Sequence, residues 1–149
     1  MGRVSVSSVT KIRVRYADTD QMRRAYYGNY FSYFEEGRSE LLRSIGLPYP
    51  EIESMGYYLP VAEAQAKYLK PARYDDLLAI TATIDNVPEA RILIRYEVRL
   101  DGSPDLLATG YTVHPFVAIE TGKPTRPPRR FMDLLETAFL RGPFQIAAV

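Results

Sequence analysis

Residues 29–45 restrict the fold of this chain more than any other segment, because they read as one long amphipathic helix. Apolar side chains recur every three or four positions, while serines and charged residues occupy the opposite arc. The apolar arc consists of Tyr30, Phe31, Tyr33, Phe34, Gly37, Leu41, Leu42 and Ile45. Gly46 and Pro48 then stop the helix, and a shorter helix is predicted over 49–55. A long one-sided helix needs a broad apolar surface to pack against.

Strand patterns in the rest of the chain supply that surface. Residues 91–100 alternate apolar and charged side chains, and turn sequences join them to strands predicted over 77–87 and 106–118. Two further strands are predicted over 11–16 and 57–69, the latter with a row of small residues, Ala62, Ala64 and Ala66, against which a helix can lie closely. A Pro-rich basic connector, 121–130, precedes a terminal helix over 130–140. The prediction is an α+β fold in which one antiparallel sheet packs on one long helix.

Length and charge narrow the class of protein. The 149 residues suit a single domain over 1–149, and a net charge of +1 gives no field that would attract nucleic acid or an anionic membrane. The absence of Cys excludes disulfides and thiolate sites, and is consistent with the reducing cytoplasm. No signal-peptide pattern and no apolar window of about 20 residues is present, so we expect a cytoplasmic protein without a membrane span.

Common catalytic motifs are missing from the sequence. It has no Gly-rich phosphate loop and no nucleophile elbow, and its one histidine cannot form a transition-metal cluster. His114 lies mid-strand and is predicted to be a packed structural residue. The basic group Arg126, Arg129 and Arg130 is either a solvated loop or an intersubunit phosphate site. Any catalytic chemistry must therefore come from other residue types.

Two acids, Asp18 and Asp20, lie shortly before the long helix. Free backbone N–H groups and the positive end of the helix dipole can stabilise an oxyanion there, and a nearby carboxylate can attack a carbonyl or activate water. Asp20 and the N–H of Tyr27 would make a minimal hydrolase. Alternatively, the two acids cap loops and pair with Arg13, Arg15 or Arg23. Spacing alone leaves both interpretations open.

Three motifs resemble a known family. "YADTDQM...YYGNYFSYFEEGRSELLRSIGL", "YYLPVAEAQAKYLKPARYDDLL" and "LLATGYTVHPFV", within about 11–118, are similar to the hotdog-fold acyl-CoA thioesterases around 4-hydroxybenzoyl-CoA thioesterase and the Tol-Pal-associated enzymes. The resemblance implies a five-stranded antiparallel sheet wrapped around a central helix, and acyl-CoA bound between subunits of a homodimer or homotetramer. It implies no metal, and no cofactor other than the CoA of the substrate.

By this resemblance, Asp20 matches the catalytic aspartate, as nucleophile or general base, and the backbone N–H of Tyr27 matches the oxyanion donor. The resemblance also implies that the Tyr27 position contacts the acyl group, and Tyr26, Asn29 and Tyr30 are further candidates for binding the substrate. The reaction would release a free acid and CoA.

Several charged residues have two interpretations. Relatives usually carry Gly where this chain has Arg23, which changes the backbone angles available to the loop. Arg23 and Arg24 contact CoA phosphates or are solvated, and Lys70 and Arg73 are further phosphate candidates. Glu63 either tunes the site or is an exposed or interfacial charge. Arg38 is expected to pair with Glu35 or Asp18.

Two rivals follow from the same residues. The substitution at Arg23 suggests a non-catalytic hotdog that binds acyl-CoA or scaffolds a partner. The "DTD" motif also suggests a magnesium phosphatase, but those enzymes resemble a parallel βαβ fold, whereas this sequence predicts a meander. We therefore favour the thioesterase.

Overall fold

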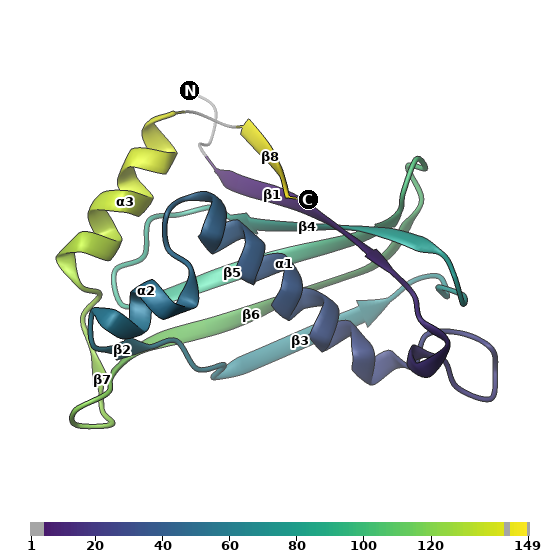
Figure 1. The fold of residues 1–149 in the computed structure, drawn as a ribbon, viewed down its shortest axis with the longest axis horizontal. Helices are drawn as coiled ribbons and strands as arrows, with labels where there is room; N and C mark the ends of the chain where they lie inside the picture. Colours follow the sequence, from purple (N-terminus) through teal and green to yellow (C-terminus); the bar gives the residue numbers. More distant parts are fainter. Residues whose placement is uncertain (1–4, 142–143, 149) are drawn as a thin grey trace.

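The computed structural model describes residues 5–141 and 144–148, in which a long helix, α1 (Tyr30–Ser44), crosses one face of a curved sheet (Figure 1). The five long strands are antiparallel and lie in the order β3 (Glu63–Tyr68), β6 (Leu106–Ala118), β5 (Arg91–Leu100), β4 (Leu77–Ile84) and β1 (Val6–Arg13). Short strands β2 (Tyr57–Tyr58) and β7 (Pro124–Thr125) pair with β6, and β8 (Phe144–Ala148) pairs parallel to β1. The predicted α+β arrangement is confirmed, with the parallel β8 as an addition.

Glycines let α1 lie close to the sheet. A Cβ added at Gly37 would be 3.0 Å from the Ile80 side chain, and one at Gly110 would be 2.6 Å from the Phe34 ring. Phe34 instead stacks on Tyr96 with ring centroids 4.3 Å apart, so helix and sheet share a tightly packed aromatic core. Of the predicted small row, only Ala66 lies near this contact, half-buried and paired with Gly110, whereas Ala62 and Ala64 are exposed.

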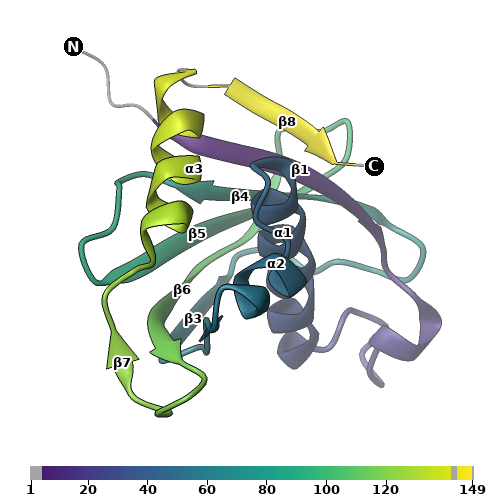
Figure 2. The same cartoon turned by 60° about the vertical axis from the view of Figure 1, so that its left-hand side comes forward.

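Two shorter helices close one end of the sheet (Figure 2). They are α2 (Tyr49–Ser54) and α3 (Arg129–Leu140), close to their predicted ranges. In α3, Phe131 is buried and meets Phe116 edge to face, with centroids 4.9 Å apart. Arg130 forms an ion pair with Glu51 of α2 at 2.7 Å.

The first strand was predicted in the wrong place. It spans Val6–Arg13 rather than 11–16, and Tyr16 lies in a 3-10 turn with 79% of its surface exposed. The hydroxyl side chains of Ser8 and Thr10 are buried, although such residues read as surface in a sequence. The segment predicted as one strand over 57–69 is two strands, interrupted at 59–62, where Pro60 lies.

Several buried polar groups of β5 and β6 are joined by hydrogen bonds. His114 Nδ1 contacts the Leu59 carbonyl at 3.2 Å and must donate, so its Nε2 accepts from the Thr112 hydroxyl at 2.8 Å. The Thr112 oxygen then accepts from the Tyr96 hydroxyl at 2.6 Å. Burial, together with the charge of Arg38, lowers the pKa of His114 to about 4. The prediction that His114 is a packed structural residue is confirmed.

Arg38 belongs to the same interior but has a different partner from the one expected. Its Nε donates to the Tyr49 hydroxyl at 3.2 Å, and only 8% of the residue is exposed. The predicted pairing with Glu35 or Asp18 is wrong, because Arg38 forms no ion pair within the described residues and Asp18 is bound by Arg15. We refer to Arg38, Tyr49, Tyr96, Thr112 and His114 as the buried polar network.

No helix within the described part of the chain is long and apolar enough to cross a membrane.

Candidate active site

The loop between β1 and α1 turns the two acids toward different surroundings. Thr19 and Ala25 form a bridge, so residues 20–24 make a small hairpin loop. Asp20 N donates to Arg24 O and Arg23 N donates to Asp20 O, both at 3.0 Å. Such short loops need a residue in the left-handed region, and Arg23 occupies it with φ of 63°. Gly adopts this conformation without strain, so the Gly that the resemblance implies at this position would suit the loop.

Asp18 is fully engaged by the protein. Only 6% of it is exposed, and its carboxylate accepts hydrogen bonds from the backbone N–H and guanidinium of Arg15 and from the Tyr33 hydroxyl. Burial pushes the pKa of Asp18 upward, but the hydrogen bonds from Arg15 and Tyr33 outweigh it and hold the pKa below its ordinary value. Asp18 is therefore ionised at neutral pH, and its hydrogen bonds order the loop.

Asp20 is engaged much less. One carboxylate oxygen accepts the Met22 N–H at 2.9 Å, and no donor of the described residues bonds to the other oxygen. Asp20 and Asp18 line different hollows of the surface, whereas a magnesium site built on "DTD" would bring both to one. The antiparallel sheet also differs from the parallel βαβ fold of that rival.

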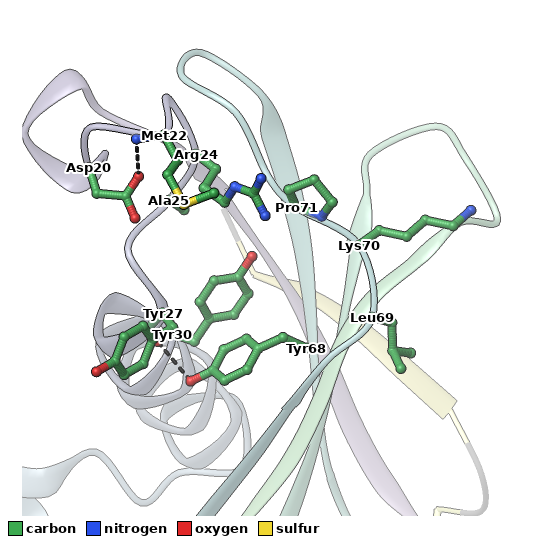
Figure 3. Close-up of a pocket in the computed structure, with 10 residues that line it drawn as sticks. All are labelled: Asp20, Met22, Arg24, Ala25, Tyr27, Tyr30, Tyr68, Leu69, Lys70 and Pro71. Atoms are coloured by element: carbon green, nitrogen blue, oxygen red, sulfur yellow. Dashed lines mark hydrogen bonds between the residues drawn. The ribbon is translucent and has the colours of Figure 1, made fainter.

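Asp20 lies at a pocket of about 360 Å³ beside the start of α1 (Figure 3). The lining residues are Asp20, Met22, Arg24, Ala25, Tyr27, Tyr30, Tyr68, Leu69, Lys70 and Pro71. One wall comes from the 20–25 loop, another from the chain leaving β3, and tyrosines lie between them. Asp20 is the one carboxylate among these lining residues.

The tyrosines form a connected group at the start of α1. Tyr30 is buried and meets Tyr68 edge to face at 5.0 Å, and the Tyr68 hydroxyl donates to the Tyr27 carbonyl at 2.9 Å. Burial raises the pKa of the Tyr30 and Tyr68 hydroxyls, so both remain protonated at neutral pH. Tyr27 begins a 3-10 turn (Tyr27–Asn29) that runs into α1. Its N–H bonds to no acceptor among the described residues, as expected for a first helical turn.

Five of the ten predicted site residues line this pocket, namely Asp20, Tyr27, Tyr30, Arg24 and Lys70. The others lie outside its lining. Tyr26 packs on Tyr27 at 4.5 Å, and Glu63 lies on the exposed edge of β3. The Asn29 side chain donates to the Asp18 carbonyl at 2.7 Å, which orders the loop before α1, and its role in binding substrate stays a prediction.

The two remaining phosphate candidates are both exposed. Arg23 lies at the tip of the loop, and Arg73 pairs with Arg24 through an isolated backbone bridge. Lys70 also forms an ion pair with Asp105 at 3.5 Å. Of these four cations, only Arg24 and Lys70 line the pocket.

Sequence reasoning missed Tyr68, the residue that connects β3 to the turn before α1. Its contact with Tyr27 spans 41 positions, so no local pattern could reveal it. An aromatic residue at the end of a strand of small and polar residues, "EAQAKY", was the available signal.

Comparisons with known proteins agree on one family. A family model described as the thioesterase superfamily matches residues 22–106. A protein of Aquifex aeolicus named as a candidate esterase is 31% identical over 124 residues, covering 83% of this chain and 94% of its own length. A 1,4-dihydroxy-2-naphthoyl-CoA hydrolase of Synechocystis is 30% identical and covers 74% of this chain and 81% of its own. The crystal structure of a DHNA-CoA thioesterase from Staphylococcus aureus superimposes with a TM-score of 0.81 at 30% identity, covering 91% of this chain and 89% of that one.

Proposed function

The chain belongs to the thioesterase superfamily and has the hotdog fold, and we propose that it is an enzyme that hydrolyses acyl-CoA thioesters to a free acid and CoA. The observation that carries the proposal is the single carboxylate, Asp20, in a pocket beside the free N–H groups that begin α1. A thioester carbonyl held there would face both a base and an oxyanion donor. The relatives named as acyl-CoA hydrolases support the same reaction.

In the proposed reaction, Asp20 attacks the thioester carbonyl or removes a proton from an attacking water. The carbonyl oxygen becomes an oxyanion, which accepts a hydrogen bond from the backbone N–H of Tyr27 at the positive end of α1. The C–S bond then breaks, and CoA leaves as a thiolate that takes up a proton. If Asp20 attacks, the acyl group remains on it as an anhydride, which a water molecule then hydrolyses to the acid and free Asp20; if Asp20 acts as a base, the water attacks the thioester directly.

Arg24 and Lys70, at the pocket mouth, are the proposed contacts for the CoA phosphates, with Arg23 and Arg73 nearby. Guanidinium and ammonium groups suit phosphate oxygens. Arg24→Ala should therefore raise KM more than it lowers kcat. The matched control is Arg43→Ala, because Arg43 lies near the other end of α1.

We propose that the enzyme is a homo-oligomer joined through β3. Among the described strands β3 pairs with β6 alone, and its other edge is open. Tyr27, Phe31 and Tyr68, in the same region, are exposed. Unpaired strand edges recruit a second strand, and a two-fold axis would pair β3 with its copy. A stable monomer by light scattering at micromolar concentration would disprove this arrangement.

Free-thiol release from a panel of acyl-CoA substrates tests the function. The panel should include 4-hydroxybenzoyl-CoA, 1,4-dihydroxy-2-naphthoyl-CoA and short alkyl-CoA esters, with chelator present. We expect chelator-resistant turnover, and a preference for 4-hydroxybenzoyl-CoA would support the narrower kinship with its thioesterase. The rival, a non-catalytic hotdog, predicts that several acyl-CoA esters bind while none is hydrolysed.

A further inference from the structure

Tyr68 joins the sheet to the turn that carries the proposed oxyanion donor. It is the last residue of β3 and pairs with Ala108 of β6. Its hydroxyl donates to the Tyr27 carbonyl at 2.9 Å, and its ring contacts Tyr30 and Tyr27 at centroid distances of 5.0 and 6.1 Å (Figure 3). One side chain thus contacts both tyrosines at the start of α1.

The turn needs such a contact because its other restraints come from one side. Tyr26 N donates to the Asp18 carbonyl at 2.8 Å, and the Asn29 amide donates to the same oxygen at 2.7 Å. Both hold the turn to the loop before α1. Tyr27 itself is 60% exposed, so packing contributes little to fixing its peptide group. The hydroxyl of Tyr68 is the restraint from the sheet.

We propose that Tyr68 is a positioning residue, whose hydroxyl fixes the Tyr27 turn so that its N–H meets the oxyanion; this rests on the proposed function. An oxyanion donor acts only within a narrow range of distance and direction, so a turn that moves loses transition-state stabilisation more than substrate affinity. A hydrogen bond to the Tyr27 carbonyl limits that movement. The position of Tyr68 on a paired strand makes it a rigid support.

Tyr68→Phe tests this, because it removes the hydroxyl and keeps the ring. We expect kcat to fall about fivefold, as for loss of one neutral hydrogen bond, with KM and Tm nearly unchanged. Tyr58→Phe is the control, since Tyr58 is also an exposed strand tyrosine and does not line the pocket. Equal kcat in the two variants would overturn the proposal. So would a raised KM at constant kcat, because Tyr68 would then bind substrate rather than position the turn.

Amide hydrogen exchange gives a readout that does not depend on hydrolysis. The amides of Asn29 and Tyr30 donate to the Tyr26 and Tyr27 carbonyls, so they report opening of the turn. Tyr68→Phe should speed their exchange about fivefold, while Tyr58→Phe leaves it unchanged. Unchanged exchange in Tyr68→Phe contradicts the positioning role. Faster exchange in a protein that hydrolyses no acyl-CoA supports the restraint and disproves the proposed function.

Discussion

The two polar regions along α1 differ in how their hydrogen-bonding groups are used. In the buried polar network, the polar groups bond to one another within the protein, since His114 bonds to Thr112 and Thr112 to Tyr96. At the start of α1, one Asp20 oxygen and the Tyr27 N–H bond to nothing in the described residues. The first region resembles the interior of any stable protein, whereas the second keeps polar groups available for a ligand.

The difference shows that polar residues in aromatic surroundings are not enough to identify a site. Both regions contain tyrosines and charged side chains, and both contain a pKa shifted by burial, that of His114 in the network and that of Tyr30 at the pocket. What separates them is whether the protein itself supplies each partner. Variants of the network should therefore change stability, and variants of the pocket should change turnover.

The largest effect on stability is expected from acid. His114 has a pKa of about 4 in the folded protein and about 6.5 when unfolded, so the unfolded state binds more protons between these values. Stability from the neutral imidazole is complete above about pH 6.5 and is lost as pH falls to about 4, which amounts to about 3 kcal/mol.

Urea unfolding at pH 7 and pH 4 measures this loss, with His114→Gln as the variant that cannot titrate. The free energy of unfolding should fall by about 3 kcal/mol less in the variant than in the wild type. An equal fall in both proteins would show that the network is not what acid breaks.

The next largest effect on stability is expected at Asp18. It lies two residues from Asp20, yet its carboxylate has hydrogen-bond partners in the protein, like the groups of the buried polar network. Asp18→Asn loses the charge and one acceptor atom beside Arg15 and Tyr33, and should destabilise by about 1–3 kcal/mol. Asp133→Asn is the control, since its ion pair with Arg129 is exposed and worth under about 1 kcal/mol. If Asp18→Asn is as stable as the control, the hydrogen bonds of Asp18 do not stabilise the fold as proposed.

A smaller effect of opposite sign is expected at Arg23. Its left-handed conformation, φ of 63°, favours Gly, so Arg23→Gly should stabilise by about 0.5–1 kcal/mol. Arg23→Ala keeps the strain and should gain nothing. Thermal melts of the two variants separate backbone strain from charge, and a raised KM in both would instead identify Arg23 as a phosphate contact.

Tyr27→Phe should have the smallest effect. The substitution leaves the backbone N–H in place, and the Tyr27 side chain it alters is 60% exposed. We expect kcat within about threefold of the wild type. A loss of about a hundredfold would mean that the phenol, rather than the peptide group, takes part in the chemistry.

Sequence predicted the framework well because it depends on local periodicity. The ranges of α1, β5 and β6 were predicted to within a residue, since their apolar spacing matches one face of a helix or strand. The first strand was misplaced because Ser8 and Thr10 are buried in a strand that packs against α1, although their sequence looks half polar. Partners far apart in the chain, such as Tyr68 with Tyr27 or Arg38 with Tyr49, depend on tertiary structure and left no local signal.

The site was predictable only in part for the same reason. Asp20 and Tyr27 could be proposed because both precede one recognisable helix. The different surroundings of Asp18 and Asp20 could not, because each depends on a turn whose hydrogen bonds the sequence does not display.

Single-turnover hydrolysis by Asp20→Asn tests the central claim most directly. The variant keeps the shape and the hydrogen bond from Met22 but removes the negative charge, so the chemical step should slow by at least about a hundredfold. Acyl-CoA affinity and Tm should remain near the wild-type values. Asp18→Asn should instead lower Tm and leave the rate of the chemical step nearly unchanged. Turnover near the wild-type rate in Asp20→Asn would contradict the assignment of Asp20 as the catalytic carboxylate.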